Sequence, residues 1–530
     1  RLGVIHSEVF GGFSGMAAAD RIVDSGSNVL ITMDGYHRGG NMIDHKVNAD
    51  IAFEHAKKQG QKVDKVLIWQ RYPGQYQSES KPVKGRDYIV NDVLKDYVGK
   101  RIDPVKLPAE DPLFLMYTTG TTGKPKGCQH SIGGYLAYVA GTSKYIQDIH
   151  PEDVYWCMAD IGWITGHSYI VYGPLALAAS SVIYEGVPVY PDPGRPWRIA
   201  ERLDVNIFHT APTTVRMLRK AGPDEPKKYN YHFKHMTTVG EPIEPEVWRW
   251  YHKEVGKGEA IIVDTYWQTE TGGFLCSTMP ALQPMKPGSA GPAVPGIHPV
   301  IFDEDRNELG AGAGKAGNIC IQNPWPGAFQ TIWGDRERYV DTYYAKYCKD
   351  PKSKDWRDWP YLTGDAALLS EDGYYRILGR IDDVINVAGH RLGTKELESS
   401  ALTIGEIAEA AVVPVVDELK GRVPDIYISL KPGVKDGKAV QAKVVKAIET
   451  EIGKIARPKN VYVVPDMPKT RSGKIMRRVL AAISNTLDIG DVMTLANPDI
   501  VEEIRVLVQG KDKVATKKGP EDIERFGDEG

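Results

Sequence analysis

Short apolar runs alternate with helical patterns along most of this chain. Four runs of strand length are residues 66–69, 206–210, 260–263 and 318–322. Such alternation favours an α/β fold in which mixed β-sheets are layered against helices. Another apolar run, residues 2–10, follows directly on Arg1. Because a natural chain rarely begins inside an element, we expect further residues upstream of Arg1.

A change of pattern near residues 379–383 predicts a domain boundary. Beyond it the chain shows, in order, a helical pattern over 394–402, strand patterns over 410–416 and 425–430, a helical pattern over 440–455 and a strand pattern over 460–464. This is sufficient for one small α/β domain. We therefore expect a large domain over residues 1–381 and a small one over 382–509. The charged segment 510–530 has almost no apolar residues, which predicts a disordered tail.

Charge, hydrophobicity and cysteine content indicate which partners and which cellular location to expect. The 530 residues include 66 basic and 69 acidic side chains, giving a net charge of −3, so no global field attracts nucleic acid or an anionic membrane. The most apolar stretch, 169–187, is interrupted by Gly173 and Pro174 and predicts buried core, with no membrane span. Five widely spaced cysteines favour a reducing, cytoplasmic location. A homo-oligomer is compatible with this composition.

The strongest local signal for chemistry is the loop at residues 117–127, Tyr-Thr-Thr-Gly-Thr-Thr-Gly-Lys-Pro-Lys-Gly. It follows an apolar strand pattern over 112–116. Three glycines allow a close approach of the backbone to a ligand, and the threonine hydroxyls and lysines provide donors and positive charge. This combination predicts a polyphosphate-binding loop. Its spacing differs from that of a Walker A loop, and Pro125 follows the first lysine.

Five ordered motifs resemble those of the acyl-adenylate-forming superfamily. The phosphate loop is followed by Tyr-Trp-Gln-Thr-Glu-Thr-Gly-Gly at 266–273, Tyr-Leu-Thr-Gly-Asp at 361–365, Gly-Arg-Ile-Asp-Asp at 379–383 running on to Gly-His-Arg at 389–391, and Pro-Lys-Thr-Arg-Ser-Gly-Lys at 468–474. The resemblance implies a large multi-layer N-terminal domain of mixed β-sheets, helices and a small β-barrel. It also implies a small, mobile C-terminal α/β domain.

Within this superfamily the chain is similar to the acetyl-coenzyme A synthetase family. Residues 160–169, 239–242 and 264–270 carry much of that similarity, which extends from Arg1 to about Gln509. Roughly the first fifth of the family pattern is absent from the sequence. The resemblance implies that ATP, Mg²⁺ and coenzyme A are used to convert acetate, through acetyl-adenylate, to acetyl-coenzyme A, AMP and diphosphate.

The resemblance also assigns roles to individual residues. Lys474 would lie between the acid carboxylate and the α-phosphate, and Thr118 and Glu270 would hold the magnesium ion. Asp365 and Arg380 would bind the ribose, and Arg391 a phosphate oxygen. The other residues assigned to the nucleotide are Thr119, Gly120, Thr121, Thr122, Gly123, Lys124, Gly240, Glu241, Pro242, Asp264, Thr265, Tyr266, Trp267, Gln268 and Thr269.

A bulky residue at position 267 implies a small acid pocket. Members of the family place a tryptophan there, and an indole leaves room for only a methyl or ethyl group. The residues assigned to this pocket are Trp163, Ile164, Thr165, Val239 and Trp267. One methylene changes binding in an apolar pocket by only about 1–3 kcal/mol, so propionate stays open as a substrate.

The resemblance is weaker at the coenzyme A site. It assigns Arg38, Thr165, Ala388 and Gly389 to coenzyme A, and Asp382 to the hinge between domains. However, Asn41, Val189 and Glu449 replace residues that commonly contact this cofactor. Arg21, Lys454 and Arg457 are candidates to compensate. The weaker coenzyme A pattern leaves open an adenylating enzyme with another acid or acceptor. The absent first part of the family pattern leaves open a second alternative, a non-catalytic component of an assembly.

Overall fold

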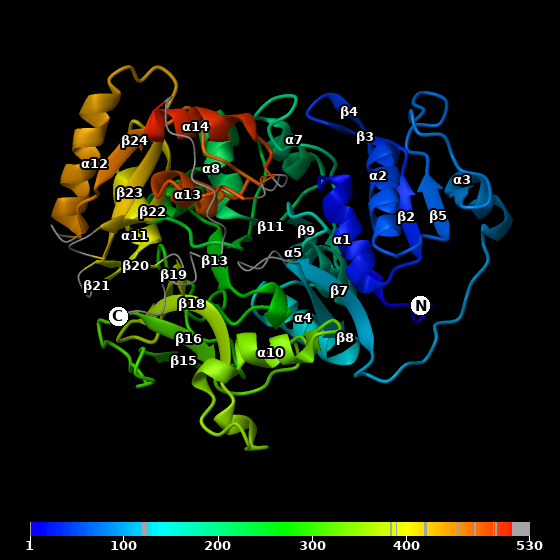
Figure 1. Cartoon of the computed structure of the whole chain (residues 1–530), viewed down its shortest axis with the longest axis horizontal. Helices are drawn as coiled ribbons and strands as arrows, with labels where there is room; N and C mark the ends of the chain where they lie inside the picture. Colours follow the sequence, from blue (N-terminus) through cyan, green and yellow to red (C-terminus); the bar gives the residue numbers. More distant parts are fainter. Residues whose placement is uncertain are drawn as a thin grey trace.

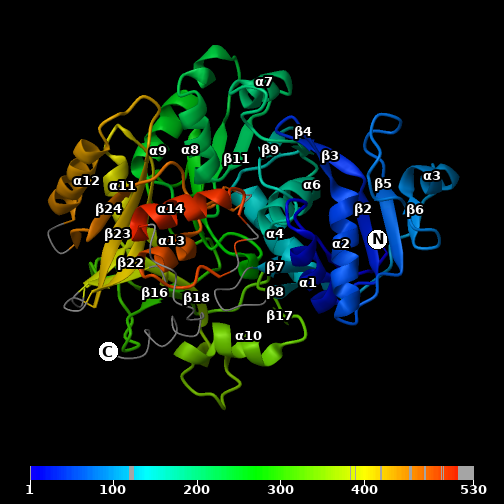
Figure 2. The ribbon, with the colours of Figure 1, turned by 45° about the horizontal axis from the view of Figure 1, so that its top comes forward.

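The computed structural model is mixed α/β, with a large N-terminal and a smaller C-terminal domain (Figure 1). It describes residues 2–118, 125–381, 384–387, 390–417, 421–452, 456–470, 473–490, 492 and 495–510. The C-terminal elements β20 to α14 lie together at one side of both views, opposite the first elements of the chain (Figures 1 and 2). The exact boundary at residues 381 and 382 stays a prediction.

A six-stranded sheet forms the centre of the large domain, in the order β10-β9-β11-β12-β13-β14. Its strands are β9 (Val154–Cys157), β10 (Ser180–Ser181), β11 (Ile207–Thr210), β12 (His235–Thr238), β13 (Ile261–Tyr266) and β14 (Cys276–Ser277). All neighbours are parallel except β13 and β14. Parallel neighbours need crossovers, which here contain α7 (Arg195–Arg202), α8 (Pro212–Ala221) and α9 (Pro245–Trp250). The strands predicted over 206–210 and 260–263 are confirmed as β11 and β13.

A second sheet carries the strand that leads into the predicted phosphate loop. Its order is β1 (His6–Ser7), β7 (Pro112–Thr118), β8 (Lys126–Ser131) and β17 (Thr331–Ile332). Helix α4 (Gly133–Tyr145) follows β8, and residues of α4, β7 and β9 share one buried core. The strand expected over 2–10 is limited to the two residues of β1 because only these pair with β7.

The first part of the chain forms a three-stranded parallel sheet, β2 (Val29–Met33), β5 (Lys65–Trp69) and β6 (Asp87–Ile89). Helices α1 (Gly15–Ser25) and α2 (His45–Lys58) bury their apolar side chains together with those of β5. The hairpin β3 (Gly35–Arg38) and β4 (Asn41–Asp44) connects β2 to α2, and α3 (Val90–Val93) follows β6. The strand predicted over 66–69 is confirmed as β5.

A four-stranded antiparallel sheet adjoins the central one. It consists of β15 (Pro299–Phe302), β16 (Gly317–Ile321), β18 (Tyr361–Leu369) and β19 (Tyr375–Arg380), and α10 (Arg336–Tyr343) lies between β17 and β18 in the chain. The family resemblance implied a small β-barrel. In the part of the chain that the structure describes, β15 and β19 do not pair, and Gly291 bridges to Tyr375 on the open side of β19. Within the described residues, this sheet is therefore an open four-stranded one.

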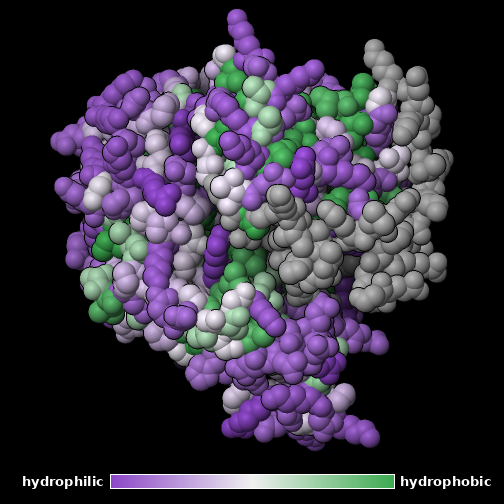
Figure 3. Space-filling model, turned by 90° about the vertical axis from the view of Figure 1, so that its left-hand side faces the viewer, coloured by the Kyte–Doolittle hydropathy of each residue, from purple (hydrophilic) through white to green (hydrophobic). Residues whose placement is uncertain are grey.

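The small domain contains the five predicted elements in the predicted order, as α11, β22, β23, α12 and β24, and adds β20, β21, α13 and α14. Its sheet contains β20 (Val384–Val387), β21 (His390–Gly393), β22 (Ile407–Asp417), β23 (Gly421–Leu430) and β24 (Asn460–Val463). Helices α11 (Thr394–Leu402) and α12 (Gly437–Glu451) cover one face with one core, and α13 (Arg477–Ser484) and α14 (Asp499–Gln509) cover the other. Hydrophilic side chains dominate the outer surface on this side (Figure 3). The predicted tail from Lys511 lies outside the described residues.

The apolar stretch 169–187 is folded into the core of the large domain. It contributes to the π-helix η2 (His167–Tyr172), α6 (Gly173–Ala176) and β10, and Tyr169 and Ile170 are buried. Among the residues that the structure describes, no helix has the length and apolar character needed to cross a bilayer. All five cysteines are buried with free thiols.

Candidate active site

Asp365 and Arg380 meet through strand pairing. They lie opposite each other on β18 and β19, with Asp365 Oδ1 3.6 Å from Arg380 Nη1. Gly364 has a φ of +74°, and a Cβ there would lie 2.7 Å from Arg380 Nη2, so glycine allows the guanidinium to approach. Burial raises the pKa of Asp365, and Arg380 opposes that shift.

Two side chains from the motif at 266–273 donate to the same carboxylate. Tyr266 Oη donates to Asp365 Oδ2 at 2.7 Å and Gln268 Nε2 donates to it at 2.6 Å. Gln268 Nε2 also donates to the carbonyl of Thr363 at 2.8 Å. The structure therefore brings together four residues that the resemblance assigned to the nucleotide. Their contacts fix the orientation of Asp365 beside the carboxyl end of β13.

Glu270 and Thr118 both lie near Cys128, close to the start of β8. Thr118 ends β7 and pairs with Lys126, and its hydroxyl contacts the thiol of Cys128. Glu270 lies in the 3₁₀-helix η5 (Thr269–Thr271), and Tyr343 Oη donates to its Oε1 at 2.6 Å. Burial lowers the pKa of Lys126, whereas the charge of Glu270 raises it, so these two side chains lie close enough to interact.

The oxygen donors at this position suit a magnesium ion. Glu270 Oε2 accepts no hydrogen bond from any residue that the structure describes, and the Thr118 hydroxyl offers a second oxygen nearby. Mg²⁺ prefers oxygen ligands, retains several waters and is commonly held by one or two protein groups together with substrate phosphates. These two residues fit that pattern. No larger cluster of metal-ligating His, Cys, Asp and Glu side chains occurs within the described ranges.

The two segments assigned to adenosine leave neighbouring parallel strands at the same edge. Gly240, Glu241 and Pro242 follow β12, and the motif starting at Asp264 ends β13, with Thr238 paired to Asp264. Open α/β sheets bind ligands at the carboxyl ends of their strands. Burial raises the pKa of Asp264 to about 7, although its Oδ1 accepts bonds from the Thr238 hydroxyl and the Thr265 amide.

The carboxylate of Glu241 is paired with other side chains of the large domain. Thr213 donates to it through both its amide and its hydroxyl, and Arg216 Nη2 donates to both carboxylate oxygens at 2.9 Å. Burial alone would raise the pKa of Glu241, but Arg216 and Lys395 outweigh it and hold the pKa far below its usual range. Any contact of this loop with adenosine is therefore left to the backbone and to Pro242.

Trp267 is braced by two aromatic rings. Its indole meets the edge or face of Tyr169 and Phe274 nearly at right angles, with ring centroids 5.1 and 5.7 Å away. Tyr169 and Phe274 themselves stack at 4.2 Å, and the Tyr169 hydroxyl is held by Thr142. Trp267, Ile164 and Val239 belong to one buried core. Phe274 was not predicted, since nothing in its local sequence pattern distinguishes it from other core residues.

Trp163 lies apart from this group. It packs on Phe10 and Phe13, with centroid distances of 5.6 and 5.9 Å. Thr165 is half-buried in the short helix α5 (Ile164–Gly166). Ile164, Val239 and Trp267 thus share the core of the large domain, whereas the ring partners of Trp163 are Phe10 and Phe13.

The residues assigned to coenzyme A, and those that replace the usual family contacts, have the following neighbours in the structure. Arg38 and Asn41 pair across the β3–β4 hairpin, whose tip lies beside Val187 and Tyr190. Arg457 forms a 3.1 Å ion pair with Glu449, which neutralises that substitution locally. Arg21 is 4% exposed and turns inward to the Ala17 carbonyl and the Phe13 ring, so it is not available to a ligand.

Several predicted site residues lie outside the described part of the chain. They are Thr119, Gly120, Thr121, Thr122, Gly123, Lys124, Lys454, Asp382, Ala388 and Gly389, together with the side chain of Arg391. Lys474 is described: its amide donates to the Thr470 hydroxyl at 3.1 Å, and the loop is closed by a bridge between Lys469 and Ile475.

Comparisons with known proteins agree on one family. The model of the AMP-binding enzymes matches residues 1–333, and that of the AMP-binding enzyme C-terminal domain matches residues 396–474. An acetyl-coenzyme A synthetase from Wolinella succinogenes is 47% identical over 513 residues, covering 96% of this chain and 76% of that protein. One from Rhizobium rhizogenes is 46% identical over 514 residues, with the same coverage of both chains.

A solved structure supports the fold. The acetoacetyl-CoA synthetase from Streptomyces lividans superposes with a TM-score of 0.77 at 23% identity, covering 94% of this chain and 73% of that one. At this identity the likeness concerns the fold alone. Its extent agrees with a large domain followed by a smaller C-terminal one.

Proposed function

This chain belongs to the AMP-binding enzyme family, and from that membership we infer that it is an AMP-forming acetate–coenzyme A ligase. Its substrates are acetate, ATP and coenzyme A, and its products are acetyl-coenzyme A, AMP and diphosphate. The observation that carries this assignment is the 45–47% identity to acetyl-coenzyme A synthetases over nearly the whole chain.

In the first half-reaction an acetate oxygen attacks the α-phosphorus of ATP. The bond from that phosphorus to the bridging oxygen of the β-phosphate breaks, and diphosphate leaves with the electron pair. Acetate is a weak nucleophile that approaches an anionic triphosphate, so the site must align both groups and neutralise charge. Lys474 would place its ammonium between them, and Asp365 would fix the ribose by accepting bonds from its hydroxyls.

A magnesium ion bound by Glu270, Thr118 and phosphate oxygens would neutralise charge that develops on the departing diphosphate. Tyr343 holds Glu270 through the 2.6 Å hydrogen bond to Oε1, which leaves Oε2 for the ion. Lys126 would add a cation beside this carboxylate.

In the second half-reaction the thiol sulfur of coenzyme A attacks the acetyl carbonyl carbon. The thiol proton is released, and AMP leaves with the oxygen that came from acetate. We propose that the small domain turns at Asp382 between the halves, taking Lys474 away and bringing Gly389 in. Such a movement lets one site serve two steps in sequence.

Trp267 supports a preference for the smallest acids. Its ring is held on two sides by Tyr169 and Phe274, so it cannot swing aside without displacing a stacked pair. Propionate, with one more methylene, would remain a slower substrate because that group changes binding by only about 1–3 kcal/mol.

Production of AMP from ATP, Mg²⁺ and acetate, with and without coenzyme A, tests the assignment. The expected result is AMP formation that requires both acetate and coenzyme A. Acetate-dependent exchange of diphosphate into ATP without thioester formation would instead favour another acceptor. Absence of turnover with acetate or propionate in a folded preparation would contradict the assignment. Fractionation of cells expressing the protein would test the predicted cytoplasmic location.

A further inference from the structure

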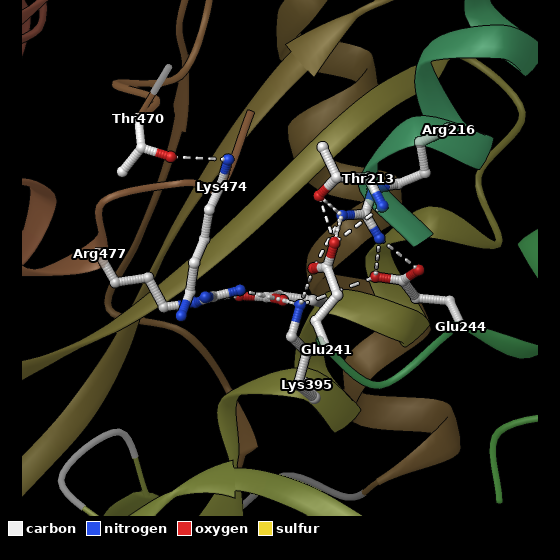
Figure 4. Close-up of polar contacts among 9 residues, drawn as sticks. Thr213, Arg216, Glu241, Glu244, Lys395, Thr470, Lys474 and Arg477 are labelled. Atoms are coloured by element: carbon white, nitrogen blue, oxygen red, sulfur yellow. Dashed lines mark hydrogen bonds and ion pairs between the residues drawn. The ribbon is translucent and has the colours of Figure 1, made fainter. Parts of the chain in front are cut away.

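Six charged side chains form one network where the two domains meet (Figure 4). They are Arg216, Glu241 and Glu244 of the large domain and Lys395, Glu398 and Arg477 of the small domain. Three carboxylates face three cations, so the network is neutral. All six side chains are at most 16% exposed, which makes an unbalanced charge here costly.

Each domain contributes a closely paired group of three charged side chains. Arg216 binds Glu244 at 2.8 Å and Glu241 at 2.9 Å, all within the large domain. In the small domain, Arg477 donates to both oxygens of Glu398 at 2.9 and 2.8 Å, and Lys395 approaches Glu398 at 3.0 Å. These contacts do not depend on how the domains are oriented.

Lys395 alone joins the two halves of the network. Its Nζ lies 3.7 Å from Glu241 Oε2 and 3.9 Å from Glu244 Oε1. Among the residues that the structure describes, these are the ion pairs that cross between the domains. They are longer than the pairs within each domain, so this joint is the one that opens when the domains move apart.

The network connects the lysine loop to the adenosine loop by two routes. On the first route, Arg477 lies three residues after Lys474 and pairs with Glu398. Glu398 also pairs with Lys395, and Lys395 in turn approaches Glu241. On the other route, a Cβ on Gly473 would lie 2.8 Å from Thr213 Cγ2, and Thr213 donates directly to Glu241. In Figure 4, Lys474 and Arg477 lie on one side of the network, with Thr213 and Arg216 on the other.

We propose that Lys395 is a positioning residue for adenylate formation, fastening the small domain to Glu241 and Glu244 so that Lys474 faces the nucleotide loop. The proposal rests on the function inferred above and adds to it a residue that touches no substrate. When the small domain turns, Lys395 would leave with Glu398 while Arg216 keeps Glu241 and Glu244 paired.

A groove lies beside this contact. It has a volume of about 260 Å³ and is lined by residues of both domains that include Glu244, Arg249, Arg376, Ser400 and Ile452. Glu244, which Lys395 Nζ approaches at 3.9 Å, is one of the lining residues, so the ionic contact lies at the edge of this groove.

The first test compares Lys395→Gln with wild type in the two half-reactions. Acetate-dependent exchange of diphosphate into ATP should fall about tenfold or more, whereas thioester formation from added acetyl-adenylate and coenzyme A should be nearly unchanged. Lys395→Arg, which keeps the cation, should restore most of the exchange. Equal loss in both half-reactions, or no loss in either, would overturn the proposal.

A matched control is Lys443→Gln. Lys443 pairs with Glu406 within the small domain and is 55% exposed, so the variant removes a lysine pair without touching the interface. Both half-reactions should match wild type. A similar selective loss in this control would show that removing a lysine from the small domain is sufficient, and would overturn the specific role of Lys395.

A second test needs no activity. Because all five natural cysteines are buried, spin labels on Lys253→Cys and Lys446→Cys report the distance between domains. Lys395→Gln should broaden or shift that distance distribution, and Lys443→Gln should leave it unchanged. An unchanged distribution in Lys395→Gln would overturn the proposal even if the enzyme proved to use another acid.

Discussion

Asp365 Oδ2 accepts hydrogen bonds from Tyr266 at 2.7 Å and from Gln268, two residues of a motif almost one hundred positions earlier in the chain. Tyr266 ends β13 and Asp365 lies on β18, so two different sheets meet at this carboxylate. Groups carried by paired strands are held more rigidly than groups on loops. The carboxylate of the proposed ribose site is thus held rigidly within the large domain, whereas Lys474 belongs to the small domain.

Asp365→Asn should weaken nucleotide binding. The amide keeps one acceptor but loses the charge that faces Arg380, and a hydrogen bond to a charged group contributes about 1.5–3 kcal/mol. We expect the KM for ATP to rise by at least tenfold, which is about 1.4 kcal/mol, with the KM for acetate little changed. Steady-state kinetics measure both. An unchanged KM for ATP would contradict the ribose assignment.

Lys474→Gln should separate the two half-reactions. Loss of a preorganised positive group at developing charge costs about 2.7–4 kcal/mol, so diphosphate exchange should fall by at least about a hundredfold. Thioester formation from added acetyl-adenylate should persist. Lys459→Gln, an exposed lysine of the same domain, is the control. If thioester formation fell in parallel, Lys474 would not be specific to adenylation.

Phe274→Leu should relax acid selectivity by removing one support of Trp267. The ratio of kcat/KM for butyrate to that for acetate should rise, by about tenfold per methylene that the pocket gains, or roughly 1.4 kcal/mol. Phe233→Leu removes a buried ring from a separate core and serves as the control for general destabilisation. An equal change of this ratio in both variants would contradict the proposal that Phe274 limits the acid pocket by supporting Trp267.

Asp264→Asn should alter the dependence of stability on pH. Burial raises the pKa of Asp264 from 3.8 to about 7, so between these values the folded state keeps a proton that the unfolded chain releases. The contribution of Asp264 therefore favours folding at low pH and declines as pH rises to about 7, by up to about 1.4 kcal/mol per unit.

Asparagine cannot ionise and retains the oxygen that accepts from Thr238 and Thr265. The denaturation midpoint of the variant, relative to wild type, should increase between about pH 4 and pH 7 and level off above that. Denaturant titrations at several pH values measure it. A difference that was flat or fell over this range would contradict a raised pKa.

Local patterns predicted most of the elements, and the helix over 394–402 coincides with α11. Apolar periodicity and the motifs are both local in the sequence, so they could be recognised without knowing which residues contact each other in the fold. The strand over 2–10 was overestimated because pairing with β7 limits it, which depends on a partner one hundred residues away.

The neutral network at the domain interface was not predicted. Lys395 and Glu241 are separated by more than 150 positions, and in the sequence each resembles an ordinary surface charge. Only the folded chain shows that their neighbours Arg216 and Glu398 are buried and already paired. The inward orientation of Arg21 could not be predicted either, because it depends on contacts that only the folded chain shows.

The fate of the two acetate oxygens distinguishes an acetyl-adenylate intermediate from any other route. With acetate labelled by ¹⁸O at both oxygens, attack on the α-phosphorus and later cleavage of the acyl carbon–oxygen bond should leave one ¹⁸O in AMP and the other in acetyl-coenzyme A. Mass spectrometry of the products would show this. Label in the diphosphate, or AMP without label, would contradict an acetyl-adenylate intermediate.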